Sequence, residues 1–144
     1  MRSLLLAALL SASASAALAD ELTVGQTLAC ASATPSRQLF VVVAKVEPFG
    51  AQTAVGVSLY DRTPGARLPV VGHLPVDRDV LTASCKPQTA VTLPISEHFQ
   101  AGYENWRAAV AAQKAGVFTL TPDQIEDMLL KQLPPAKPAG SAPQ

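Results

Sequence analysis

Two histidines, His73 and His98, are the residues of this chain that are best suited to acid–base chemistry. His73 lies in a largely apolar run and is followed closely by Asp77 and Asp79, and a neighbouring carboxylate can orient an imidazole that transfers protons. These three residues are the catalytic candidates for a small hydrolase or lyase. A competing interpretation ranks ahead of it, in which His73 is a strand-end histidine that bonds to the backbone or to Asp77. His98 is expected to be solvated on the flank of a helix.

The sequence lacks the motifs of metal-binding, serine-nucleophile and phosphate-binding sites. A zinc site would require both histidines and a distant carboxylate, because the sequence contains no H-E-x-x-H and no paired Cys–His spacing. Residues 77–79 match a calcium-binding loop at two positions only, and Ser58 lacks the second glycine of a nucleophile elbow. We find no glycine-rich phosphate loop in the sequence. We therefore expect neither a metal nor a cofactor.

A second set of candidates, Tyr103, Trp106 and Arg107, could form an aromatic platform for a ligand with a cation beside it. Two of them also belong to a stripe at helical spacing that includes Phe99 and Val110. Such a stripe is typical of the buried face of a helix, and we expect burial of Trp106 ahead of a role in ligand binding.

The two cysteines, Cys30 and Cys85, allow one internal pairing, and the C-x-x-C spacing of redox catalysts is absent. In an oxidising compartment this predicts a structural disulfide. A disulfide that closes a loop of this length stabilises the fold by at most roughly 4 kcal/mol, because it restricts the unfolded chain. The alternative is two free buried thiols or a metal-binding pair.

The first residues predict export. Arg2 precedes an apolar run over residues 4–10, small residues follow, and residues 17–19 form an A-x-A site. We expect cleavage after Ala19, which would leave a periplasmic or secreted protein. The alternative, an uncleaved anchor, would require about 20 apolar residues, and this run is much shorter.

Length and charge narrow the classes of partner. The 144 residues contain eleven Lys and Arg against eleven Asp and Glu, and removal of Arg2 with the signal leaves one net negative charge. This balance gives no electrostatic reason to expect nucleic acid or an anionic membrane surface. We expect one domain over residues 20–133, no stable membrane insertion, and a flexible proline-rich tail over residues 134–144.

Strand patterns occupy the first half of the domain. Residues 39–46 are β-branched and almost continuously apolar, as in a strand that is covered on both faces. Residues 54–60 alternate apolar and polar side chains and predict a half-buried partner in an antiparallel hairpin. Shorter strands are expected at the sheet edge over residues 22–28 and over residues 68–74, where Pro69 restricts pairing.

Helix patterns occupy the second half. The aromatic stripe predicts a helix with Ser96 as its N-cap and with Gly116 as its stop signal. Thr121 and Gln124 form a capping box around Pro122, which predicts a second amphipathic helix. Both helices follow the strands in the sequence.

Together these patterns predict an α+β fold. We expect a small antiparallel sheet packed by the two C-terminal amphipathic helices, both on one face, with the aromatic stripe as the inner seam and with one disulfide. Between the strands and these helices, Asp77 is placed to cap a short helix, and residues 86–94 are expected to form a loop or a short strand.

The segments 102–107 (GYENWR) and 114–119 (KAGVFT) resemble a pattern of small uncharacterised exported proteins of Gram-negative bacteria. The resemblance covers residues 99–130, the C-terminal third of the chain. It implies an exported protein with a helix–strand–helix unit, and it implies no activity and no site residue.

The sequence therefore favours an exported periplasmic binding or accessory protein without catalysis of its own, whose partner is an envelope protein or a small ligand. One alternative is the hydrolase or lyase that uses His73 with Asp77 or Asp79. The other alternative is a carrier that holds a small ligand in a cleft between helix and sheet.

Overall fold

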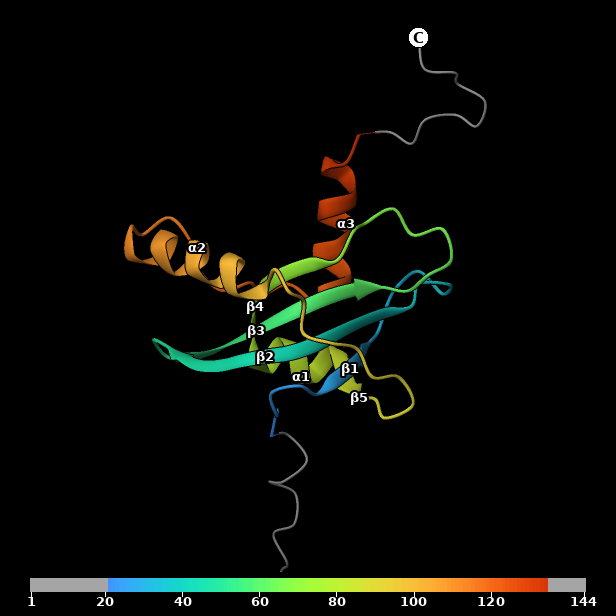
Figure 1. Cartoon of the computed structure of the whole chain (residues 1–144), viewed down its shortest axis with the longest axis horizontal. Helices are drawn as coiled ribbons and strands as arrows, with labels where there is room; N and C mark the ends of the chain where they lie inside the picture. The colour runs from blue at the N-terminus through green and yellow to red at the C-terminus, as the bar shows by residue number, and fades with distance from the viewer. Residues whose placement is uncertain (1–20, 135–144) are drawn as a thin grey trace, which may run out of the picture.

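The computed structural model of the chain describes residues 21–134 (Figure 1). The predicted signal segment, residues 1–19, and the predicted tail beyond residue 134 lie outside this part of the chain. The described residues have the α+β fold that the sequence predicts, with five antiparallel strands in one sheet and three helices. In chain order the elements are β1 (Thr27–Cys30), β2 (Leu39–Phe49), β3 (Gln52–Asp61), β4 (Val71–Asp77), α1 (Arg78–Ser84), β5 (Cys85–Pro87), α2 (Phe99–Ala111) and α3 (Pro122–Gln132).

The predicted hairpin is confirmed as β2 and β3, and it is longer than the apolar pattern indicates. Pairing extends to Phe49 and Gln52 at the turn, where Gly50 has a φ of +59°, a left-handed conformation that glycine adopts without strain. Pro48 does not end β2, because β1 pairs only with residues 39–42 and no second strand needs the missing N–H.

The first strand differs from its prediction. β1 is not an edge strand over residues 22–28: it lies inside the sheet, whose strand order is β4-β3-β2-β1-β5. The short strand β5 supplies the second neighbour, and Cys30 faces Cys85 as its register partner. The two sulfurs are bonded, with an S–S distance of 2.08 Å, so the predicted disulfide is confirmed.

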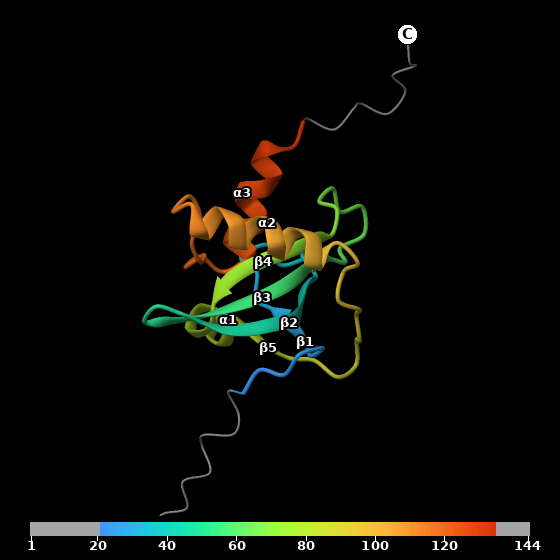
Figure 2. The same ribbon diagram turned by 60° about the vertical axis from the view of Figure 1, so that its left-hand side comes forward.

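The two faces of the sheet carry different helices. Val57 of β3 joins the main hydrophobic cluster with Leu81 of α1 and Ile125 of α3. Gly56, the preceding residue, points to the other face and contacts Phe99 of α2. The prediction that both C-terminal helices lie on one face is therefore wrong. Figures 1 and 2 show α2 and α1 on opposite sides of the sheet.

The connection between α2 and α3, residues 112–121, explains this arrangement. Phe118 forms a parallel bridge with Val76 at the outer edge of β4. The N–H of Phe118 donates to the carbonyl of Pro75, and its own carbonyl accepts from the N–H of Asp77, both at 2.9 Å. The chain thus passes round the sheet edge and brings α3 to the face opposite α2.

The capping box predicted for α3 is confirmed. The hydroxyl of Thr121 accepts a hydrogen bond from the N–H of Gln124, and the side chain of Gln124 accepts one from the N–H of Thr121. Asp77 occupies the N-cap position of α1 as predicted, but its side chain makes no capping hydrogen bond.

The predicted ends of α2 are shifted. The helix begins after His98, and the hydroxyl of Ser96 accepts a hydrogen bond from the N–H of His98. It ends at Ala111, and Gln113 with a φ of 59° supplies the left-handed residue expected at Gly116. A glycine five residues beyond the last helical residue therefore does not mark the end of this helix.

Candidate functional site

Three glycines allow α2 to lie directly on the sheet beside His73. A Cβ added at Gly102 of α2 would lie 2.7 Å from the Cβ of His73, closer than two side chains can approach. On the sheet, a Cβ at Gly72 would lie 2.9 Å from the start of α2, and a Cβ at Gly56 would lie 3.0 Å from the ring of Phe99. Because these positions carry no side chain, the helix and the sheet approach closely at His73.

The aromatic stripe of α2 packs around His73. The ring centroid of His73 lies 5.2 Å from that of Phe99, 5.7 Å from that of Tyr103 and 5.4 Å from that of Trp106. Trp106 is 8% exposed, so its predicted burial is confirmed. The catalytic candidate His73 and two of the three ligand-binding candidates, Tyr103 and Trp106, thus meet in one place, although no sequence pattern links them.

His73 is a neutral imidazole in an apolar setting. Burial lowers the pKa of His73, and the carboxylate of Glu47 opposes this shift. Within residues 21–134, its Nε2 is buried without a hydrogen-bond partner. The structure does not bring Asp77 or Asp79 to it: Asp77 lies four residues further along the strand, about 13 Å at the usual rise, and Asp79 is exposed on α1.

Tyr103 links this cluster to the end of β2. Its hydroxyl donates a hydrogen bond to Oε2 of Glu47 at 2.9 Å, and Nζ of Lys45 lies 4.4 Å from the centre of its ring. Its phenol is therefore held between a carboxylate and an ammonium group. The sequence-based candidates did not include Glu47 or Lys45, because both belong to a strand far from α2 in the sequence.

A hollow of about 470 Å³ opens beside the imidazole, and we call it the His73 cleft. Trp106 forms part of its wall and donates a hydrogen bond from Nε1 to the carbonyl of Gly116 at 2.9 Å. Its volume falls within the range of small-molecule sites, about 300–1,000 Å³. The residues that line it are His73, Pro75, Trp106, Lys114, Ala115, Gly116, Val117 and Phe118.

Two sequence candidates lie away from the cleft. Arg107 is exposed and does not line it, so the predicted cation of the aromatic platform is absent from its wall. Lys114 is the charged residue that lines it instead. The side chain of His98 is 79% exposed, as predicted, and its Nε2 lies 3.5 Å from Oε1 of Glu97.

A second cluster of ionisable groups was not predicted. Arg37, before β2, contacts Asp123, Glu126 and Asp127 of α3. The three acids are spaced i, i+3 and i+4, so they share one stripe of the helix, and this spacing was the available signal. Arg37 itself carried no signal, because 86 residues separate it from Asp123.

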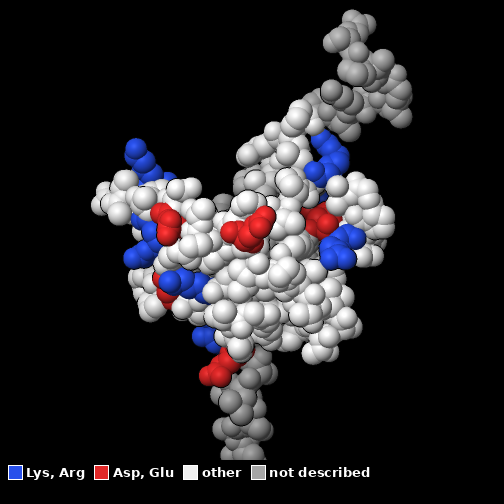
Figure 3. Space-filling model, viewed as in Figure 1, with Lys and Arg blue, Asp and Glu red and all other residues white. Residues whose placement is uncertain are grey.

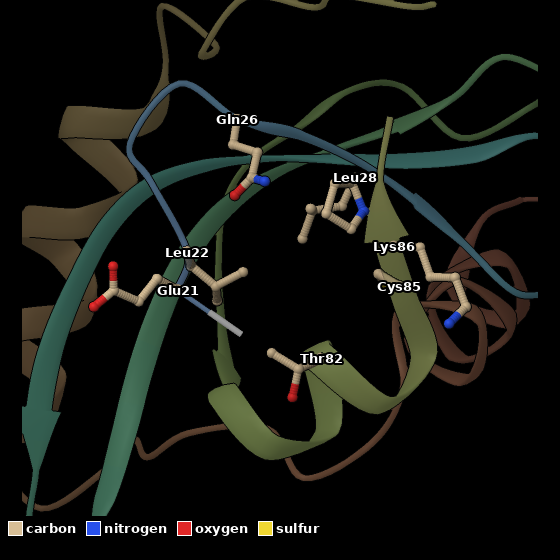
Figure 4. A pocket seen from close by; sticks show the side chains of 8 residues that line it. Glu21, Leu22, Gln26, Leu28, Thr82, Cys85 and Lys86 are labelled. Atoms are coloured by element: carbon tan, nitrogen blue, oxygen red, sulfur yellow. The ribbon is translucent and has the colours of Figure 1, made fainter. Parts of the chain in front are cut away.

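Other surfaces offer less chemistry. A hollow of about 490 Å³ lies between the first described residues, α1 and β5, and Figure 4 shows Leu22, Leu28 and Thr82 around it. Its ionisable lining residues are Glu21 and Lys86, both on the surface. Figure 3 shows acidic and basic side chains interspersed on the face seen in Figure 1, with broad uncharged areas between them. The His73 cleft is the hollow that combines aromatic walls with a half-buried imidazole.

Comparison of the chain with protein-family models, with curated proteins and with solved structures finds no match. The resemblance of residues 99–130 to small exported bacterial proteins stays a prediction. No helix within residues 21–134 has the length and apolar character needed to cross a bilayer. In the same part of the chain, no three His, Cys, Asp or Glu side chains are arranged to hold a metal ion. The interpretation of the site therefore depends on its geometry.

Proposed function

We propose that this protein is an exported binding protein that holds a small ligand in the His73 cleft and serves as an accessory to another component of the cell envelope. The observation that carries the proposal is the cleft itself, a hollow of about 470 Å³ beside Trp106 and the half-buried imidazole of His73. Export is supported by the signal pattern of residues 1–19 and by the Cys30–Cys85 disulfide, which is typical of an oxidising compartment.

The lining of the cleft indicates the chemistry of the ligand. Trp106, Pro75 and Phe118 offer apolar surface to a flat molecule. Nε1 of Trp106 donates to Gly116 and Phe118 pairs with β4, so these polar groups are already bonded, whereas Nε2 of His73 is buried without a partner among the described residues. Lys114 is the charged group on the lining, and an ammonium attracts an anion. The ligand class that fits is a small molecule with a flat apolar body and one acidic group.

The lining favours binding over catalysis. Within the described residues, no carboxylate and no nucleophilic side chain hydrogen-bonds to Nε2 of His73. Ser58 lies on the same face of the sheet, but its hydroxyl donates to the carbonyl of Gly72 and accepts from the N–H of Ser96. Both hydrogen-bonding functions of this hydroxyl therefore serve the fold, and neither is directed to a substrate.

The test is a thermal-shift and fluorescence screen of the mature protein with aromatic carboxylates. A ligand at 100 times its Kd should stabilise the fold by about 2.7 kcal/mol. It should also change the emission of Trp106, the sole tryptophan of the chain. Lys114→Ala should weaken binding of the acids at least tenfold, whereas Arg107→Ala removes an equal charge outside the cleft and should leave it unchanged. Ligands that bind without any effect of Lys114→Ala on their affinity would contradict the proposed site.

A further inference from the structure

An exposed apolar groove lies between the end of β3, the loop before β4 and the segment that leads into α2. Val70 is 48% exposed and Ile95 is 37% exposed, and they are two of the five large apolar side chains that are exposed within residues 21–134. Apolar side chains that are exposed together, and not singly, are typical of interaction surfaces. The groove has a volume of about 580 Å³. The residues that line it are Tyr60, Pro69, Val70, Pro94, Ile95, Ser96, Glu97 and His98.

Most polar groups on the floor of this groove already serve the fold. The hydroxyl of Tyr60 donates a hydrogen bond to the carbonyl of Pro94. The hydroxyl of Ser96 accepts from the N–H of His98, and the N–H of Ser96 donates to the hydroxyl of Ser58. The two prolines of the lining carry no N–H. The groove therefore fits an occupant that makes apolar contacts and needs few backbone hydrogen bonds.

The size of the groove favours a short extended segment. A stable interface between two folded proteins uses about 20–30 residues on each side, whereas eight residues line this groove. Proline-rich segments in the polyproline II conformation have no internal hydrogen bonds, and they bind in grooves that present aromatic rings. Tyr60 supplies such a ring. A proline-rich segment is thus the class of occupant that fits.

The chain itself contains a segment of this class. Residues 135–144 (PAKPAGSAPQ) include three prolines, and Pro135 and Pro138 form a P-x-x-P pattern. Most of the other residues of the segment are small, so they fit a shallow surface without a deep pocket. Proline also restricts the unbound chain, which lowers the entropy lost on binding.

The segment begins close to the groove. Nη2 of Arg67 donates a hydrogen bond to the carbonyl of Pro134, the last described residue. Arg67 lies two residues before Pro69 of the lining, a separation of at most about 7 Å along the backbone. At the polyproline II rise of about 3.1 Å per residue, the ten residues from 135 to 144 span roughly 31 Å. The segment is therefore long enough to lie along the groove.

Charge favours the same occupant. Glu97 is the acidic residue of the lining, and its side chain is 87% exposed, with Oε1 3.5 Å from Nε2 of His98. Lys137 is the charged residue of segment 135–144. It follows Pro134 by three residues, roughly 9 Å in the polyproline II conformation. An exposed ion pair adds little affinity, but it helps to fix the orientation of a bound segment.

We propose that the groove binds the proline-rich segment of its own chain, residues 135–144, as an extended polyproline II segment with Lys137 beside Glu97. The groove shares no lining residue with the His73 cleft, so this interaction is independent of the proposed function.

The first test follows methyl signals of the full mature chain by NMR. The wild type is compared with a double variant, Pro135→Gly and Pro138→Gly, which loses the P-x-x-P pattern and the restricted backbone of proline. We expect the methyl signals of Val70 and Ile95 to differ between the two proteins, because the variant leaves their surface uncovered.

Two other exposed valines are the internal control. Val24 is 58% exposed and Val46 is 40% exposed, and neither lines the groove. Their methyl signals should coincide in the wild type and the double variant. Coinciding signals at Val70 and Ile95 as well would overturn the proposal, and so would changes of equal size at all four residues.

A spin label measures the proximity of the segment directly. Both cysteines of the chain are joined in the disulfide, so Ser141→Cys supplies one free thiol for a nitroxide label. The label should broaden the Ile95 signals several-fold more in the wild-type background than in the Pro135→Gly and Pro138→Gly background. Equal broadening in the two backgrounds would show that the prolines do not hold the segment in the groove.

A charge variant tests the orientation of the segment. Glu97→Gln removes the acid of the lining and should lower the ratio of bound to free segment by up to about fivefold, the most that an exposed ion pair contributes. Glu104→Gln removes an exposed acid of α2 outside the groove and should leave the label broadening of Ile95 unchanged. Equal effects of the two variants would contradict the pairing of Lys137 with Glu97.

Dilution separates binding within one chain from binding between two copies. The Ile95 signals of the wild type should be independent of protein concentration, because the segment and the groove belong to the same chain. Signals that approach those of the Pro135→Gly and Pro138→Gly variant on dilution would show that the segment of a second copy fills the groove, and would contradict the proposal.

Discussion

At Arg37, one guanidinium meets three acidic side chains of α3, and its own side chain is 11% exposed. Arg37→Met keeps much of the volume but leaves the carboxylate of Asp123 buried without its cation. Removal of one partner from a buried ion pair costs about 3–5 kcal/mol. We expect a loss of this order in the free energy of unfolding, measured by urea denaturation at pH 7.

The matched control for this change is Arg67→Met. Arg67 is exposed, and its Nη2 donates a hydrogen bond to the carbonyl of Pro134. A surface substitution of this kind alters stability by less than about 0.5 kcal/mol. Equal losses in both variants would show that the Arg37 cluster is no stronger than an ordinary surface contact.

His73 illustrates what the sequence can predict about one residue. Its apolar neighbours marked it as a candidate, and the helical spacing of Tyr103 and Trp106 marked the stripe, but nothing local indicated that they would meet. Closeness in sequence suggested Asp77 as its partner, yet four residues of extended strand separate the two side chains by about 13 Å. Glu47, which does affect the pKa of His73, comes from a different strand.

The packing of α2 on the sheet depends on Gly102. The helix would gain about 1 kcal/mol of intrinsic propensity from Gly102→Ala. The added Cβ, however, would lie 2.7 Å from the Cβ of His73 in β4, and overpacking costs about 1–3 kcal/mol. Because neither Cβ can rotate away, we expect the steric cost to exceed the gain and the free energy of unfolding to fall by up to about 2 kcal/mol.

Gly116→Ala provides the control for this prediction. A Cβ at Gly116 would have no atom within 4 Å, so we expect a change of less than about 0.5 kcal/mol. Denaturant titrations of both variants, followed by Trp106 emission, make the comparison. A Gly102→Ala protein more stable than the wild type would show that α2 and the Cβ of His73 are not in close contact at this position.

The elements themselves were predictable where a local pattern fixes them. The capping box at Thr121 predicts the start of α3 because all its hydrogen bonds lie within four residues. The faces of the sheet that α2 and α3 cover were not predictable in this way. They depend on the course of residues 112–121 round the edge of β4, through a single bridge at Phe118.

For the whole molecule, the disulfide is a long-range constraint. It joins residues 55 positions apart in sequence and holds the three-residue strand β5 against β1. We expect the double variant Cys30→Ala and Cys85→Ala to lose roughly 4 kcal/mol or less of stability, mainly because its unfolded chain is less restricted. Urea denaturation of this variant and of the reduced wild type should give similar losses. A loss below about 1 kcal/mol would show that the constraint contributes little beyond the β1–β5 pairing.

The pH dependence of stability also belongs to the whole molecule, because groups on different elements act in opposite directions. The raised pKa of Glu126 makes stability fall as pH rises from about 4.5 to about 8, since the unfolded chain releases that proton first. The lowered pKa of His73 makes stability fall as pH drops below 6.5, because the imidazole of the unfolded chain is protonated at a higher pH than that of the folded protein. The two effects oppose each other between pH 4.5 and 6.5.

His73→Gln separates the effect of His73 on the pH dependence of stability from the effect of Glu126. The variant lacks the imidazole, so the stability of the wild type relative to it should decrease as pH falls from 7 to 5, measured by urea denaturation at each pH. His98→Gln, at a side chain that is 79% exposed, is the matched control. Parallel curves for the wild type and His73→Gln would mean that His73 has the same pKa in the folded and unfolded protein. That result would contradict the lowering of its pKa by burial under α2.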